Sequence, residues 1–246
     1  MKRFSWEILL GIYLVALSAV FYFIHYMIFR DVHHIFIYLL GDIAFVPIEV
    51  LLVTMIIHRL LDEREKRSKL EKLNMVIETF FSETGTRTLA YFSVSDPGIG
   101  SIRKDLIITN DWSDRDFSNM HKRLKDQPPE VDIRRTDLEG LKNHLIEKRS
   151  FMLRLLENPV LLEHESFTDL LRALFHLTEE LVNRKSTADL PASDLEHLSG
   201  DIKRAYGMLS HQWLDYMKYL KGNYPYLFSL AMRTNPFDRE ASPIVK

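Results

Sequence analysis

The chain has 246 residues, with 32 Lys and Arg against 34 Asp and Glu, and it contains no cysteine. The lack of cysteine excludes disulfides, thiolate catalysis and Cys-based zinc sites. The net charge of −2 argues against a nucleic-acid binder, which carries a strongly basic domain or stripe. Nine glycines and nine prolines are few for this length and disfavour an all-β protein.

The first apolar segment runs from Ile8 to Phe29 without an Asp, Glu, Lys or Arg. About 20 such residues span a bilayer, whereas the apolar part of a cleaved signal peptide is only about 7–15 residues long. A second apolar segment, from about His33 to Leu61, follows directly. We therefore predict an N-terminal hairpin of two transmembrane helices over residues 1–61, with the lipid bilayer as its surroundings.

Basic residues lie before the first predicted span and after the second, and therefore on the same side of the membrane. They are Lys2, Arg3, Arg59, Arg64, Lys66, Arg67, Lys69 and Lys72. The positive-inside rule then predicts a multi-pass protein of the inner (plasma) membrane with both termini in the cytoplasm and the short turn outside. His33 and His34 lie in that outer turn. A pH-sensing or metal-binding mouth is one interpretation of this pair, although interfacial histidines are more often simply hydrated.

Two carboxylates interrupt the second apolar segment. Asp42 and Glu49 are seven residues apart, so on a helix they point the same way to within about 20°. An ionisable residue at the centre of a span costs roughly 2.5–3.5 kcal/mol, and neither segment has a Lys or Arg at matching depth. His25 is one candidate for pairing with them. Pro47, which lies between the carboxylates and has no N–H to donate, predicts a kink.

Two interpretations of these carboxylates remain open. They line a cation path or relay protons in an oligomer, or they are protonated and hydrogen-bond between helices to fix assembly. In both cases we expect a homo-oligomer, because two helices alone enclose no pore. The leading hypothesis is a channel for inorganic cations, lined by acidic residues of the second span.

The rest of the chain predicts an all-α protein. Residues 62–95 read as a helical extension of the second span, with apolar Leu70, Leu73, Ile77 and Phe80 at heptad-like spacing. After the break at residues 96–98, residues 96–246 read as a cytoplasmic helical bundle. Its predicted helices begin at the capping pairs Ser113/Asp116, Thr136/Glu139, Ser166/Asp169 and Ser193/Glu196. Residues 106–108 and 132–134 are weak strand candidates.

Several histidines in the predicted bundle lie near acidic residues. His197/Asp201 and His211/Asp215 are i,i+4 pairs on the last long predicted helix, and this spacing can ligate a metal. Arg204 lies on the same helix face as these pairs, which favours simple ion pairs instead. His176 with Glu179 and Glu180 reads as a polar surface. We therefore predict no metal site and no cofactor. Because the phosphate-binding, metalloprotease and nucleophile-elbow motifs are also missing, we expect no enzyme activity.

Two stretches of the chain are similar to a known family. They are LLGDIAFVPIEVLLVTMIIHRLLDERE at 39–65 and HQWLDYMKYLKGNYPYLFSLAMRTNPFD at 211–238. They resemble a family of uncharacterised bacterial and archaeal membrane proteins with two spans, and the resemblance covers nearly the whole chain. It implies the hairpin followed by a cytoplasmic helical domain, and it brings no activity or functional residue.

An alternative to the channel comes from another class of protein. The chain would then be a membrane-anchored scaffold or sensor whose helical domain binds a protein partner. An exposed aromatic segment, Tyr224–Phe228, would form the docking surface. Accessibility of Asp42 and Glu49 separates the two hypotheses, because a channel needs them hydrated and a scaffold needs them buried between helices.

Overall fold

The computed structural model describes residues 6–162 and 164–245 of the chain, and within these residues every regular element is a helix. The all-α prediction is confirmed for this part of the chain. Residues 106–108 and 132–134 form no strands, because Leu106 ends one short 3-10 helix and Ile133–Arg135 form another. Lys2 and Arg3 lie outside the described residues.

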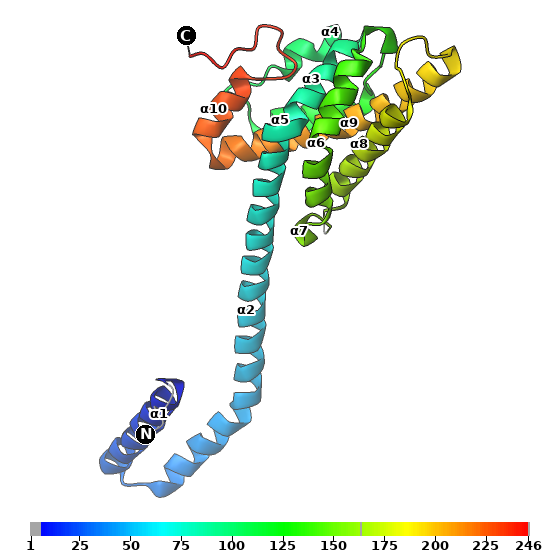
Figure 1. Cartoon of the computed structure of the whole chain (residues 1–246). Helices are drawn as coiled ribbons and strands as arrows, with labels where there is room; N and C mark the ends of the chain where they lie inside the picture. Colours follow the sequence, from blue (N-terminus) through cyan, green and yellow to red (C-terminus); the bar gives the residue numbers. More distant parts are fainter. Residues whose placement is uncertain (1–5, 163, 246) are drawn as a thin grey trace. The chain divides into compact units, whose positions relative to one another are not determined.

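Ten α-helices are labelled in chain order in the described part. They are α1 (Trp6–Phe29), α2 (Val32–Phe80), α3 (Thr86–Ser95), α4 (Ile99–Ile102), α5 (Asp114–Asp126), α6 (Leu138–Leu156), α7 (Pro159–Leu162), α8 (Glu165–Asn183), α9 (Ala192–Asn223) and α10 (Pro225–Arg233) (Figure 1). A π-helical turn, Phe81–Gly85, joins α2 to α3. The chain divides into two compact units, Met1–Lys66 and Arg67–Lys246.

The first unit holds α1 and the beginning of α2. Only Arg30 and Asp31 separate these two helices, and Arg30 has a left-handed φ of 53° that reverses the chain. The two helices are long and apolar enough to cross a membrane, and none of the residues in their most apolar windows is buried. Each helix therefore exposes its apolar side chains. An exposed apolar surface of this size is unfavourable in water.

The second unit is a helical bundle around α9, which packs against α3, α5, α8 and α10. Helix α8 lies between α9 and α6 in these contacts (Figure 1). Helices α8 and α9 each contribute an apolar face to the core, from Phe167 to Leu181 and from Leu198 to Leu220. The end of α2 joins this core through Leu73, Ile77 and Phe80, whereas Leu70 of the same predicted seam is exposed.

The starts of three helices differ from the predicted capping pairs. Helix α5 begins after Ser113 with the expected capping box, but α6 is capped by Asp137, whose carboxylate accepts from the Gly140 N–H at 2.8 Å. His164 takes the capping position of α8, and α9 starts after Pro191. Each shift is one or two residues. Asp137 and His164 each accept a backbone N–H at the start of their helix, whereas α9 starts after Pro191 without a side-chain cap.

The aromatic segment Tyr224–Phe228 is only partly exposed. Residues from Pro225 onward form α10, and this helix is amphipathic. Its Phe228 is buried in the core, whereas Tyr226 is 71% exposed. The expectation of a continuous exposed aromatic surface is therefore wrong for Phe228.

Candidate functional site

Asp42 and Glu49 lie on α2 in the first unit, and both are exposed. Within the described residues, neither carboxylate takes part in a hydrogen bond or an ion pair. Pro47 lies inside the same helix, and Figure 1 shows a bend in the light-blue part of α2, the stretch of chain that contains this residue. The structure thus places the two carboxylates and the proline on one helix, and the carboxylates have no partner among residues 6–66.

His25 does not reach the carboxylates. Its ring stacks on His34 at a centroid distance of 5.7 Å, with Phe29 at 4.7 Å, so it belongs to an aromatic group at the turn between α1 and α2. Nε2 of His25 and Nδ1 of His34 are buried there, and neither has a hydrogen-bond partner among the residues that the structure describes. Of the predicted polar residues, the structure therefore brings His25 and His34 together and leaves Asp42 and Glu49 apart from them.

His33 and His34 lie in the first turn of α2, and Asp31 binds their backbone N–H groups. Oδ1 of Asp31 accepts from the His33 N–H at 2.9 Å and from the His34 N–H at 3.3 Å. Asp31 is thus an N-terminal cap, and its negative charge lies at the end of the helix where it is most favourable. The turn is built by ordinary capping, which leaves the imidazole of His33 free to contact the surroundings.

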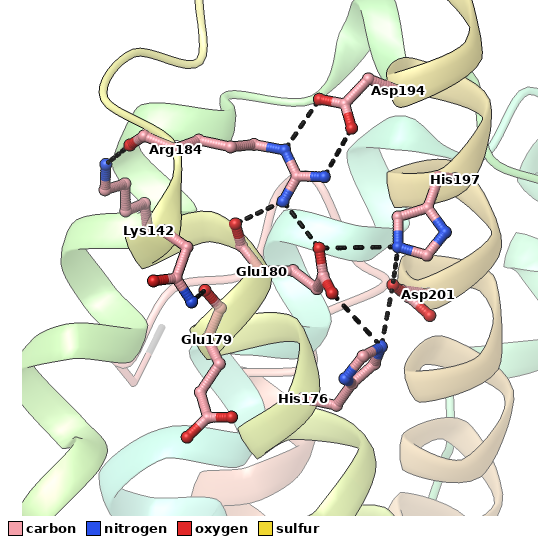
Figure 2. Close-up of polar contacts among 9 residues, drawn as sticks. Lys142, His176, Glu179, Glu180, Arg184, Asp194, His197 and Asp201 are labelled. Atoms are coloured by element: carbon pink, nitrogen blue, oxygen red, sulfur yellow. Dashed lines mark hydrogen bonds and ion pairs between the residues drawn. The ribbon is translucent and has the colours of Figure 1, made fainter.

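A second group of polar side chains lies in the bundle, where α8 faces α9 (Figure 2). His176 and Glu180 come from α8, and His197 and Asp201 come from α9. Nε2 of His176 and Nε2 of His197 each lie 3.4 Å from Oδ2 of Asp201. Glu180 lies 3.5 Å from His197 and 3.9 Å from His176. We call these four residues the α8–α9 cluster.

Arg184 anchors one edge of the α8–α9 cluster. Its guanidinium donates to both carboxylate oxygens of Asp194, at 2.8 and 2.6 Å, and to Oε2 of Glu180 at 2.8 Å. These hydrogen bonds lower the pKa of Asp194 and of Glu180 and raise the pKa of Arg184. Both carboxylates are therefore ionised at neutral pH, and Glu180 is held in place by Arg184.

This ion-pair network predicts a stability that depends on acid. Because the folded pKa values of Asp194 and Glu180 are lowered, the unfolded chain binds protons first as pH falls. Their contribution is complete above the ordinary carboxyl pKa of about 4 and is lost as pH falls through the lowered folded values. We expect Arg184→Gln to reduce the Tm at neutral pH and to flatten its fall toward about pH 3. Parallel Tm curves for the two proteins, followed by circular dichroism, would contradict this account.

His211 and Asp215, the other predicted pair, do not bond directly to each other. His121 of α5 lies between them, with its Nδ1 at 2.8 Å from Nδ1 of His211 and its Nε2 at 3.0 Å from Oδ1 of Asp215. Burial and the neighbouring His121 lower the pKa of His211, while Asp215 acts in the opposite sense. This group is a hydrogen-bonded chain that ties α5 to α9.

The sequence analysis named His197/Asp201 as a spacing that can ligate a metal, but it interpreted His176 with Glu179 and Glu180 as a polar surface. Each half is an i,i+4 pair of a histidine and a carboxylate, which is visible in the sequence. What the sequence does not reveal is that α8 and α9 pack with these two pairs facing each other. Among the described residues, His176, Glu180 and His197 each offer one ligand atom within 4.8 Å of the others.

The fold and the polar groups define an all-helical protein with an N-terminal helical domain and a C-terminal helical domain. Comparison with known families gives a consistent assignment. The model described as MJ1433, N-terminal helical domain, matches residues 2–61. The model described as Uncharacterized protein MJ1433, C-terminal helical domain, matches residues 69–233.

The chain belongs to this MJ1433 family. It is 48% identical over 240 residues to the Uncharacterized protein MJ1433 of Methanocaldococcus jannaschii, a match that covers 98% of this chain and 96% of the relative. No solved structure matches the chain. The relative is therefore similar to this protein over both helical domains, and its name assigns no activity.

Proposed function

We propose that this protein is an integral membrane protein whose α1 and the beginning of α2 form a transmembrane hairpin. The support is physical: both helices are long enough to span a bilayer, and their apolar windows are unburied. Arg59, Arg64 and Lys66 follow the second apolar segment, and Lys2 and Arg3 precede the first. This distribution favours a cytoplasmic location for both termini and for the helical bundle, in the inner membrane.

The hairpin is proposed to assemble into a homo-oligomer that surrounds a cation path. The observation that carries this proposal is that Asp42 and Glu49 share one face of α2 and have no partner in the described part of the chain. A carboxylate facing lipid is costly, so neighbouring subunits or water must surround this face. Repetition of that face around an oligomer axis produces two acidic rings, and rings of this kind attract cations.

Pro47 gives the proposed path a place to bend. Proline has no N–H for the helix ladder and frees the backbone carbonyl one turn earlier, near Ile43. That carbonyl lies between the levels of the two carboxylates and adds an oxygen that a cation can contact. A bend at this point allows the two ends of the second span to move with respect to each other, which is the motion that a gate requires.

Conductance in planar bilayers tests the proposal. We expect discrete cation-selective currents from the full chain, and we expect Glu49→Gln and Asp42→Asn to reduce conductance or selectivity several-fold, because each removes one acidic ring. Glu196→Gln, on the exposed surface of α9, is the matched control and should conduct like the wild type. Oligomers that stay silent in all proteins would instead support the membrane-anchored scaffold, with the carboxylates buried between helices.

A further inference from the structure

The α8–α9 cluster has the composition of a metal site. His176 and Glu180 are four residues apart on α8, and His197 and Asp201 are four residues apart on α9. Side chains at this spacing lie on one helix face, one turn apart. Figure 2 shows both imidazoles and both carboxylates directed into the space between the two helices. Imidazole nitrogens and carboxylate oxygens are the ligands that Zn²⁺ takes where no thiolate is present.

The distances in the cluster fit a metal better than direct hydrogen bonds. Two ligands of a tetrahedral Zn²⁺, each about 2.0–2.2 Å from the ion, are separated by about 3.3–3.5 Å. The two Nε2–Oδ2 distances to Asp201 are 3.4 Å, and the distance from His197 Nε2 to Glu180 Oε2 is 3.5 Å. The fourth distance, from His176 Nε2 to Glu180 Oε1, is longer at 3.9 Å, so the carboxylate of Glu180 must move slightly closer to His176 to complete the site. Strong hydrogen bonds between such charged groups are shorter, about 2.7–2.9 Å.

The burial of Asp201 is a second observation that favours a cation at this point. Its side chain is 4% exposed, and its Oδ2 is buried with no hydrogen-bond partner in the described part of the chain. This oxygen lies between the two imidazole Nε2 atoms, while Oδ1 faces Arg204 at 3.4 Å. An unsatisfied buried carboxylate oxygen is costly, and a cation at this point would remove that cost.

The surroundings of Glu180 resemble an outer coordination shell. Arg184 donates to Oε2 of Glu180 and is itself fixed by Asp194, so this carboxylate is held in one orientation. Hydrogen bonds to ligating carboxylates of this kind orient them and tune the bound metal. His176 and His197 are about half exposed, which leaves a route for an ion to enter from solvent.

From this geometry we propose that the bundle binds one divalent transition metal ion, with Zn²⁺ the best fit, through His176, Glu180, His197 and Asp201. The ion joins α8 to α9 and satisfies the buried oxygen of Asp201. Two imidazoles and two carboxylates satisfy the four positions that structural zinc sites fill. This site is independent of the proposed cation path, since it lies in the second unit and involves none of the residues of the hairpin.

Metal binding by the purified full-length protein tests this assignment. The protein is stripped with a chelator in detergent, and Zn²⁺ is titrated against a chromogenic competitor, with bound zinc measured by mass spectrometry. We expect one zinc per chain and a Tm that rises on zinc addition. His197→Ala, His176→Ala and Glu180→Gln should each weaken binding at least about tenfold, since each removes one proposed ligand.

Glu179→Gln is the matched control for Glu180→Gln. Figure 2 shows the carboxylate of Glu179 pointing away from the cluster, and its ionic contact is Arg149 at 3.8 Å. This variant should bind zinc like the wild type. Absence of bound zinc in the wild type would overturn the assignment. So would equal zinc affinity in the wild type and both histidine variants, each shown to be folded by circular dichroism, because the metal would then lie elsewhere.

Discussion

Trp213→Ala is expected to destabilise the helical bundle more than any other substitution considered, by about 3–5 kcal/mol. Trp213 is fully buried on α9, and its ring meets Phe237 edge-to-face at a centroid distance of 5.0 Å. Removing the indole leaves a large cavity that the surrounding helices can only partly fill. For a unit of this size, the loss corresponds to a Tm lower by on the order of 10 °C.

Near-UV circular dichroism during thermal unfolding measures this effect in the full chain. Tyr226→Ala is the control, because Tyr226 is also aromatic and lies near the end of α9, but it is 71% exposed. Its change should stay within about 0.5 kcal/mol, as for most surface substitutions. Similar Tm values for the two variants would show that Trp213 does not hold the core as described.

Gly85→Ala is the second substitution with a large expected effect. Gly85 ends the π-helical turn between α2 and α3, and a Cβ atom there would lie 2.7 Å from the rings of both Phe80 and Phe81. Both phenylalanines are completely buried, so neither ring can move without disturbing the core. Overpacking of this kind costs about 1–3 kcal/mol, even though alanine is the better helix former.

Gly200→Ala provides the matched comparison. Gly200 is exposed inside α9, and a Cβ atom there would meet nothing within 4 Å. The same change should therefore stabilise the protein by about 0.5–1 kcal/mol, because alanine loses less backbone entropy in a helix. We expect opposite signs for the two variants in thermal unfolding, and equal signs would show that the space around Gly85 is not restrictive.

Much of the bundle could be predicted from helical periodicity. The apolar positions of α8 and α9 repeat at intervals that place them on one face, and burial of that face follows. The exact first residues of the helices were harder to predict. Thr136 and Asp137 can both cap a helix, and only the local backbone conformation decides between them. The strand candidates failed since short apolar runs fit helices and loops equally well.

The polar groups show a similar limit. Each histidine–carboxylate pair of the α8–α9 cluster can be read from its own helix, but the approach of His176 to Asp201 depends on how two helices pack. In the same way, the sequence offered His25 as a partner for Asp42 or Glu49. Its stacking on His34 depends on the conformation of Arg30 in the connecting turn.

Thiol labelling of single cysteines in the second span tests the central proposal most directly. Because the chain has no cysteine, an introduced one reports alone. We expect Asp42→Cys and Glu49→Cys, in lipid vesicles, to react with a charged, membrane-impermeant thiol reagent at least about tenfold faster than Leu51→Cys, which lies about 200° around the helix from position 49. Equal, slow labelling at all three positions would contradict a hydrated path lined by Asp42 and Glu49.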